Sequence, residues 1–282
     1  MNRSSALVRI LTIAIAAVAF PFLAAAQGMT PQAQINSQTQ DNQNQQMKEQ
    51  TLQNSPKVDP KEEASYKAFF DANPQDPDAK IRLGTDFLKT YPNSRYAEAV
   101  NAGLVQAYYQ KQDWNNFYGA SDRALALNPN DVDVLVIVGW VTPHIINASD
   151  PNSTKRLDEA EANEKKAIDL IPNLPKPINL TDDQFVEVKN QKLAEAHSGL
   201  GLVDFRRQNY DDSVKELERA IQGSKTPDPT DLFALGAALQ NSQHYTEAVN
   251  AFNQCAQILS GIQDQCKQQA ATASKLAAQT KK

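Results

Sequence analysis

The chain has 282 residues, and its 28 Lys and Arg against 33 Asp and Glu give a formal net charge of −5 at pH 7. Affinity for nucleic-acid phosphates comes from clustered Lys and Arg, and the sequence has no such cluster, so nucleic-acid binding is disfavoured. After residue 26 no segment is apolar enough to span a bilayer, which predicts a soluble mature protein.

The first 26 residues have the pattern of a secretory signal. Two arginines precede an apolar core from Ile10 to Leu23, and three alanines end it ahead of Gln27. The alternative is an uncleaved membrane anchor, which would be the only membrane contact of the chain. Pro21 and an apolar run shorter than about 20 residues disfavour the anchor. We therefore expect an exported protein cleaved before Gln27.

Residues 27–60 are expected to form a disordered linker. From Gln27 to Asn54, half of the residues are Gln or Asn and none is aromatic. Such a segment cannot bury enough apolar area to offset the entropy lost on ordering. A spacer is favoured over a binding segment, and folded structure should begin near Lys61.

From Lys61 onward the sequence predicts short, paired α-helices. Apolar residues recur at three- and four-residue spacing, with Pro and Asn-Pro between the helices. Residues 232–259 align on residues 197–221 at an offset of 35, which places Leu235-Gly236 over Leu200-Gly201. This pattern resembles the tetratricopeptide repeat (TPR), in which a Leu-Gly pair in helix A lets helix B approach closely. The resemblance implies an all-α, right-handed α-solenoid over residues 61–260.

Further units precede these two repeats. Pro129 and Pro172 close successive units but lie 43 residues apart, so about nine residues within 142–156 are interpreted as an insertion. Thr181 should cap one long helix. The expected helix pairs cover about residues 78–111, 98–130, 132–172, 181–225 and 229–260.

No catalytic or metal-binding motif is recognisable. His144, His197 and His244 lack metal-ligand spacing, and the sequence has no nucleophile elbow or phosphate-binding glycine loop. We expect no enzyme activity, no metal and no cofactor. The alternative of a different class is an enzyme subunit whose active site carries no familiar motif.

An acidic run at helical spacing lies within the expected 132–172 unit. It contains Asp158, Glu159, Glu161 and Glu164, followed by Lys165 and Lys166. This pattern favours a solvated face with surface salt bridges over a general acid/base pair.

The family resemblance implies that helix A of each repeat lines a concave groove that binds a protein or peptide partner. The resemblance places the second, fifth, ninth, twelfth and thirteenth residue of each unit in that groove. Aromatic residues would anchor the partner, while Arg206 and the amides orient its backbone or a carboxylate. The alternative is that several are buried between helices, and both interpretations remain open for Trp140 and Phe233. The candidates are Gln106, Tyr109, Gln110, Val136, Trp140, Leu202, Phe205, Arg206, Phe233 and Asn241.

The chain has only two cysteines, Cys255 and Cys266. Cys255 occupies a small, buried position of helix B, and residues 261–282 are expected to form a capping helix that carries Cys266. Two antiparallel helices can bring cysteines within the roughly 4.4 to 6.8 Å Cα separation of a disulfide. Export favours oxidation, and a redox pair would normally use closer spacing, so a structural disulfide is preferred.

The function expected from these features is a non-enzymatic interaction scaffold exported to the cell envelope. The phrase YPNSRYAEA is similar to repeat domains of bacterial envelope proteins, such as the outer-membrane assembly lipoprotein and the cell-division coordinator. It favours the periplasm, or secretion, as the location. The alternative function is an accessory subunit of an envelope-biogenesis or cell-division complex.

Overall fold

The computed structural model describes residues 59–147 and 151–280. The predicted signal at 1–26 and all but the end of the predicted linker at 27–60 lie outside the described residues. The chain divides into two compact units, Met1–Ala64 and Ser65–Lys282. Only the start of the first helix represents the first unit, so the fold below is that of Ser65–Lys282.

Within the described ranges the secondary structure is helical, with no strand. This confirms the expected all-α class. The helices are α2 (Pro60–Asp71), α3 (Pro77–Thr90), α4 (Ala97–Lys111), α5 (Trp114–Leu127), α6 (Val132–Ile145), α7 (Ser153–Leu170), η1 (Ile171–Asn173), α8 (Asp182–Arg206), α9 (Tyr210–Gly223), α10 (Pro229–Asn241), α11 (Tyr245–Gln257) and α12 (Gln263–Gln279).

Side-chain caps fix where several helices begin. Helices α3, α5, α6 and α10 each start after an aspartate whose carboxylate accepts a backbone N–H of the first turn. At α8, Thr181 forms a reciprocal capping box with Gln184, at 3.2 and 3.0 Å. The cap confirms the single long helix predicted after Thr181, which spans 25 residues.

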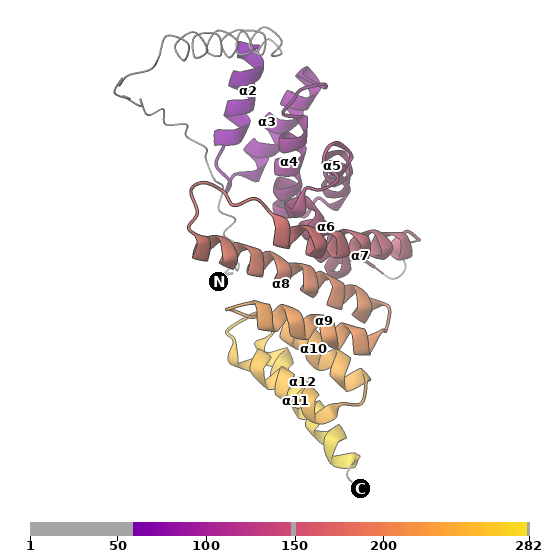
Figure 1. The fold of residues 1–282 in the computed structure, drawn as a ribbon. Coiled ribbons are helices and arrows are strands. Elements are labelled where there is room, and N and C mark those ends of the chain that lie inside the picture. The colour runs from indigo at the N-terminus through magenta and orange to yellow at the C-terminus, as the bar shows by residue number, and fades with distance from the viewer. Residues whose placement is uncertain (1–58, 148–150, 281–282) are drawn as a thin grey trace, which may run out of the picture. The chain divides into compact units, whose positions relative to one another are not determined.

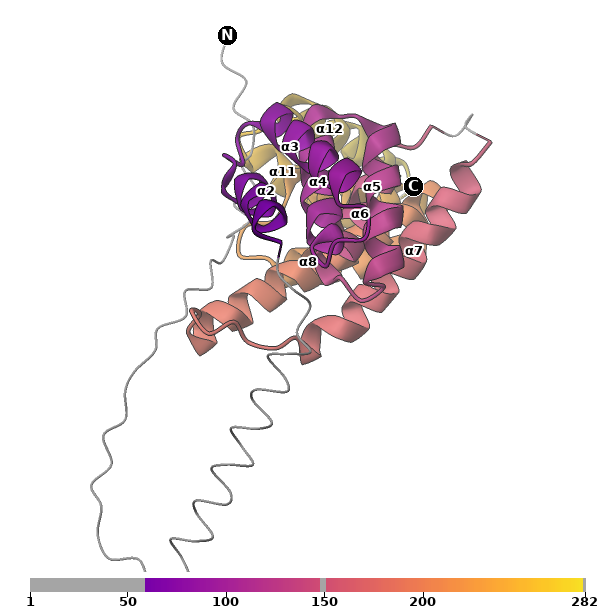
Figure 2. The same ribbon diagram turned by 90° about the horizontal axis from the view of Figure 1, so that it is seen from above.

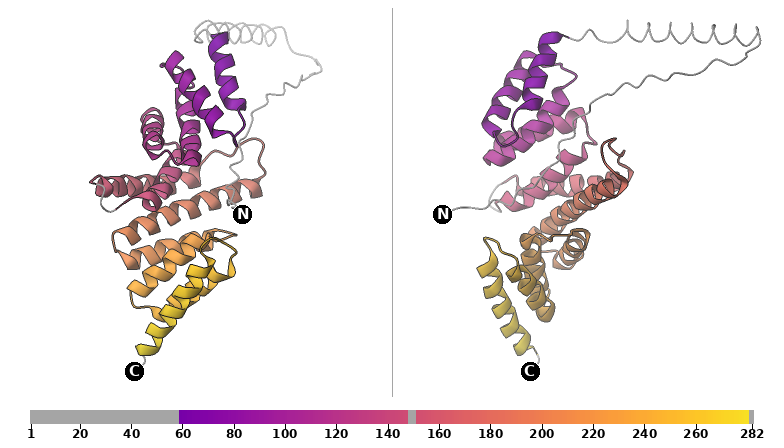
Figure 3. Two further views of the ribbon diagram at one scale, coloured as in Figure 1. Left: turned by 180° about the vertical axis from the view of Figure 1, so that it is seen from behind. Right: turned by 90° about the vertical axis from the view of Figure 1, so that its left-hand side faces the viewer.

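The helices of Ser65–Lys282 pack mainly on their neighbours in the chain, as the continuous colour sequence of Figure 1 shows. The pairs α4/α5, α6/α7, α8/α9 and α10/α11 each form an extensive interface, and α8 also packs on α6 and α7. The same succession is visible from two further sides in Figure 3. This arrangement confirms an all-α solenoid.

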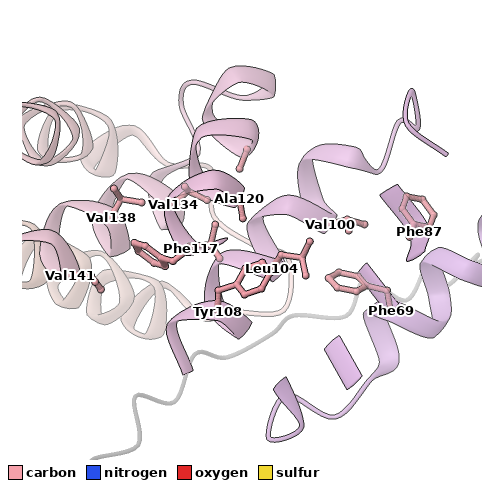
Figure 4. Close-up of a cluster of buried hydrophobic side chains, with 12 residues drawn as sticks. Phe69, Phe87, Val100, Leu104, Tyr108, Phe117, Ala120, Val134, Val138 and Val141 are labelled. Atoms are coloured by element: carbon pink, nitrogen blue, oxygen red, sulfur yellow. The ribbon is translucent and has the colours of Figure 1, made fainter. Parts of the chain in front are cut away.

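One apolar core joins α2 to α6. Phe69 and Phe87 lie at one end of this row, Leu104 in the middle, and Phe117 and Val138 toward the other end (Figure 4). Each fully buried large side chain contributes roughly 1.5–3 kcal/mol through the hydrophobic effect. A second cluster unites α8 to α12.

The expected insertion lies at the α6–α7 connection. Helix α6 runs through Pro143 to Ile145, and α7 begins at Ser153. Part of the inserted length therefore extends the helices. The first turns of α8 project past neighbouring helices in Figure 2, and its opening residues are exposed. Among the described helices, none has both the length and the apolarity of a membrane span.

Candidate partner-binding surface

Aromatic side chains of α4 and α6 meet at Trp140. The ring of Tyr109, near the end of α4, lies 6.4 Å from the Trp140 ring and 6.4 Å from that of Trp114 at the start of α5. One turn after Trp140, the His144 ring lies 4.4 Å from the indole. We call Tyr109, Trp140, His144 and Arg206 the aromatic–arginine cluster.

Arg206 ties α8 to the end of α6. Its Nε donates a hydrogen bond of 2.8 Å to the carbonyl oxygen of Pro143. The last carbonyls of a helix have no partner within the helix, so this bond satisfies one of them. Among the described carboxylates none forms an ion pair with Arg206, and its side chain is exposed. The terminal amines can therefore reach a carboxylate or carbonyl of a partner.

The Tyr109 and His144 rings of the cluster are neutral, and charged groups lie beside them. Burial raises the pKa of Tyr109 above its ordinary value of 10.0, and the negative charge of Asp228 raises it further. Burial lowers the pKa of His144 from 6.5, against the opposing effects of its bond to the Trp140 carbonyl and of Asp228. Both rings are neutral at pH 7. Asp228, which caps α10, thus brings a fourth helix within electrostatic reach of the cluster.

The cluster has the composition of a protein-binding surface. Aromatic side chains and arginine dominate the energetics of protein interfaces, because they bury large areas while keeping a polar end. His144 Nδ1 lies 2.7 Å from the Trp140 carbonyl oxygen and is occupied by the backbone. In the described part of the chain no group of three or more His, Cys, Asp and Glu side chains is placed to hold a metal ion.

The helix pairs that carry these residues share one turn. Gln112, Gln208 and Gln243 adopt positive φ angles of 56°, 65° and 66° between the two helices of their pairs. After each glutamine, the next N–H bonds the carbonyl five residues earlier, at 3.0, 2.9 and 2.8 Å. The same reversal therefore recurs at offsets of 96 and 35 residues.

A second recurring feature is the contact of a helix A glycine with helix B. A methyl group added at Gly201 would lie 2.6 Å from Leu217, and one added at Gly236 would lie 2.7 Å from Phe252. Only glycine permits this approach. In both pairs the partner follows the glycine by 16 residues.

Comparisons with known proteins agree on the fold. No protein-family model and no curated protein matches the chain. The crystal structure of MamA aligns with a TM-score of 0.51 and 18% identity over 70% of this chain and 90% of MamA. PilW, a type IV pilus biogenesis factor, aligns at 0.51 and 14% identity over 79% and 93%. TTC0263, a thermophilic TPR protein of Thermus thermophilus, aligns at 0.48 and 16% identity over 75% and 98%. The chain therefore shares the all-α fold of MamA and PilW.

Three of the predicted groove residues belong to the aromatic–arginine cluster: Tyr109, Trp140 and Arg206. Two further predicted groove residues lie on α4 near Tyr109: Gln106 is half-buried, and Gln110 is exposed. Trp140 is half-buried between Tyr109 and His144, so both predicted interpretations stay open for it.

Other predicted groove residues belong to the packing between the helices. Leu202 is buried in the core of α8–α12, and Val136 is buried against the α6–α8 contact. Both are therefore inaccessible to a partner. The half-buried Phe233 packs on Phe252, with ring centroids 5.5 Å apart. Phe205 packs likewise on Tyr210, at 5.7 Å.

Asn241 is exposed at the end of α10. Its side-chain amide donates a hydrogen bond of 2.8 Å to the carbonyl of Ala237. This local bond leaves the amide oxygen available to a partner.

The sequence-based selection missed His144 and Asp228. His144 is the thirteenth residue of its unit, so the rule that selected Arg206 in the next unit also points to it. Asp228 precedes the first position of its repeat, and the rule does not cover it.

The predicted solvated face of α7 is correct for Glu159 and Glu161 but wrong for Glu164. Glu161 pairs with Lys165 and with Arg207, which directly follows α8. The Glu164 side chain is fully buried, and neither of its carboxyl oxygens has a hydrogen-bond partner in the described structure. Lys166 donates to the carbonyl of Pro129 at 2.5 Å instead of joining a salt bridge.

A buried, hydrogen-bonded acid links α8 and α10. Asp231 accepts a hydrogen bond of 2.6 Å from the Ser198 hydroxyl. Burial raises the pKa of Asp231 to about 7, although the bond from Ser198 opposes the shift. The pairing satisfies a polar group inside the array, and Asp231 titrates close to neutral pH.

The two cysteines form a disulfide between α11 and α12. Their Cα atoms are 5.8 Å apart, within the range expected for adjacent antiparallel helices. Both are fully buried, with Leu232 of α10 against them. The bridge therefore fastens α12 to the α10–α11 pair.

Proposed function

We propose that this TPR protein is a non-enzymatic scaffold that binds a segment of a partner protein at the aromatic–arginine cluster. The observation that carries the proposal is the convergence of Tyr109, Trp140 and His144 beside Arg206, whose terminal amines have no acceptor among the described residues. Solvent-accessible aromatic surface next to a positioned cation is the composition of an interface hot spot.

The partner segment would place an apolar side chain against Tyr109 and Trp140 and a carboxylate or carbonyl oxygen on Arg206. An arginine already oriented by Pro143 loses little further conformational freedom on binding, which favours affinity. Asp228 supplies an anion nearby and would select against a strongly acidic segment. The proposal assigns no catalysis to these groups.

We also propose that the protein acts outside the cytoplasm, in the periplasm or at the surface of a bacterial cell envelope. The amino-terminal pattern of two arginines, an apolar core and three alanines supports export. A buried disulfide is compatible with an oxidising compartment. Free-thiol titration of the exported protein is the check, since two reactive thiols would contradict the bridge.

The test of binding uses position-specific photo-crosslinking in envelope extracts. A crosslinking residue replaces Gln110, which is exposed beside Tyr109, and a matched control replaces the exposed Glu218 on α9. We expect one crosslinked partner from position 110 and none from position 218. Equal crosslinking from both positions would reject a localised binding surface.

Alanine variants then test the anchors. Tyr109→Ala and Arg206→Ala should each weaken capture, because truncating a central anchor costs about 2 kcal/mol. Lys215→Ala on α9 is the surface control, and circular dichroism should show unchanged helicity in all three. The crosslinked partner separates the two candidate roles, since components of an assembly or division machine would favour the accessory subunit.

A further inference from the structure

Glu164 occupies a position that the α8–α9 and α10–α11 pairs fill with an apolar side chain. Phe252 follows Gly236, and Leu217 follows Gly201, by 16 residues, whereas Glu164 follows Gly139 by 25. The difference equals the nine-residue insertion between α6 and α7. Glu164 is therefore the structural equivalent of Phe252 and Leu217.

Two glycines on different helices enclose the Glu164 carboxyl. A methyl group at Gly139 of α6 or at Gly199 of α8 would overlap it. The helices α6, α7 and α8 contact one another pairwise (Figure 1). The carboxyl of Glu164 thus lies at the point where all three helices meet.

Among the described residues, no cation neutralises this carboxyl. On α8 the nearby titratable group is Glu195, itself largely buried and hydrogen-bonded to Gln191 at 3.1 Å. Between α8 and α6, Lys192 pairs with Asp133, which leaves that ammonium engaged elsewhere. Also on α6, His144 is bound to the Trp140 carbonyl, and the neighbouring Glu161 and Lys165 of α7 pair with each other.

An unpaired carboxylate in a dry interior is strongly unfavourable, so the neutral acid is the form that fits. Burial raises the pKa of Glu164 well above its ordinary value of 4.5, and the charge of Glu195 raises it further. Protonation and close packing of α7 are therefore linked.

We propose that Glu164 is a proton-dependent latch: its neutral form holds α6, α7 and α8 together, and its ionisation loosens the junction and with it the aromatic–arginine cluster. Gly139 immediately precedes Trp140, and Gly199 lies on the same helix as Arg206. The spacing at the junction sets the spacing between those two anchors. The consequence for partner binding rests on the proposed function, whereas the latch itself does not.

The direction follows from proton linkage. At pH values between the ordinary pKa of 4.5 and the raised pKa of the folded state, Glu164 keeps a proton that the unfolded chain has released. The folded state is then favoured by acid, and stability falls as pH rises from this ordinary value toward the raised pKa. Asp231 and Glu195 act in the same direction, so a variant of Glu164 is needed to isolate its share.

The decisive measurement compares urea midpoints between pH 5 and pH 8.5. Glu164→Gln keeps the size but cannot ionise, and Glu164→Leu reproduces the apolar occupant of the α8–α9 pair. Both variants should lose less stability with rising pH than the unmodified protein. Glu159→Gln, a partly exposed position on the same helix, should lose as much as the unmodified protein. If the Glu164 variants retain the full pH dependence, the latch is rejected.

Fluorescence tests the link to the cluster without a partner. Trp114→Phe leaves Trp140 as the single tryptophan of the chain. Its emission should shift to longer wavelength between pH 6 and 8.5 with Glu164 present, and the shift should disappear with Glu164→Gln. An identical shift in both proteins would overturn the coupling. The two proposals can fail separately. If photo-crosslinking captures no partner but the Glu164 variants reduce the pH dependence of the urea midpoint as expected, the proposed function is rejected and the latch stands.

Discussion

In the α10–α11 pair the phenyl ring of Phe252 packs against Gly236, whereas in the α6–α7 pair the carboxyl of Glu164 occupies the equivalent place against Gly139. The backbone geometry is alike, since each glycine admits the helix B side chain closely. The difference is energetic: burial of the phenyl ring in an apolar interior is favourable, whereas burial of a carboxyl without a hydrogen-bond partner is unfavourable. A repeat array can thus combine two kinds of junction between helices. We call the junction filled by Phe252 permanent, and the junction filled by Glu164 conditional because its packing depends on protonation.

The permanent junction is broken most directly by Phe252→Ala. The side chain is almost completely buried, and its removal should cost about 3–5 kcal/mol of unfolding free energy through lost burial and cavity formation. Urea denaturation at pH 7 measures the loss. A loss equal to that of an exposed substitution such as Leu259→Ala would contradict the core position of Phe252.

The disulfide adds to the permanence of this end. Replacing Cys255 and Cys266 with serine should cost about 3 kcal/mol by the chain-entropy model for a loop of this size. Hydrogen exchange should increase first in α12, which the bridge fastens to α11. The serine pair also buries two hydroxyls, so the native sequence with dithiothreitol is the matched comparison. Unchanged exchange in both would show that the bridge does not stabilise α12.

Substitution at the conditional junction should stabilise the protein, whereas substitution at the permanent junction destabilises it. Glu164→Leu is expected to raise unfolding free energy at pH 8 by about 1–3 kcal/mol, because it removes a buried group with no hydrogen-bond partner in the described structure. At pH 4.5 the gain should shrink, since half of the unfolded carboxyls, with their ordinary pKa of 4.5, are then protonated as well. Thermal unfolding at the two pH values checks the sign, and a gain independent of pH would indicate better packing alone.

The smallest expected effect is a difference between two glycine substitutions. It depends on the flexibility of the side chain that each added methyl group meets. Gly236→Ala forces a methyl against the rigid Phe252 ring, whereas Gly199→Ala meets the end of the more flexible Glu164 side chain. We expect Gly199→Ala to cost less, by about 1 kcal/mol, because overpacking is relieved when a side chain can move. Equal costs would mean that Glu164 is held as firmly as Phe252.

Much of the fold could be predicted from the sequence because the repeat signal is periodic. Glycine, small residues and prolines recur at fixed offsets, so the helix pairs follow from alignment. The long helix after Thr181 follows from a cap with a local physical cause. The cysteine pair could be placed because its two helices are adjacent in the chain.

The candidate site was harder to predict because burial in a solenoid depends on both neighbours of a helix. Leu202 and Arg206 lie one turn apart on α8, yet the first is buried and the second exposed. Glu164 was assigned to a solvated face because charged residues surround it in the sequence. The nine-residue insertion separates Glu164 from Gly139 in the sequence. Once those nine residues are subtracted, Glu164 aligns with Phe252, and the alignment predicts its burial.

The shared turns at Gln112, Gln208 and Gln243 offer a route to engineering. A left-handed backbone costs a glutamine roughly 1 kcal/mol, whereas asparagine adopts it more readily and lacks the extra freedom of glycine in the unfolded chain. These three positions are outside the proposed recognition cluster. Asparagine substitutions there would give a sturdier variant in which binding and proton sensitivity could be dissected without loss of the fold.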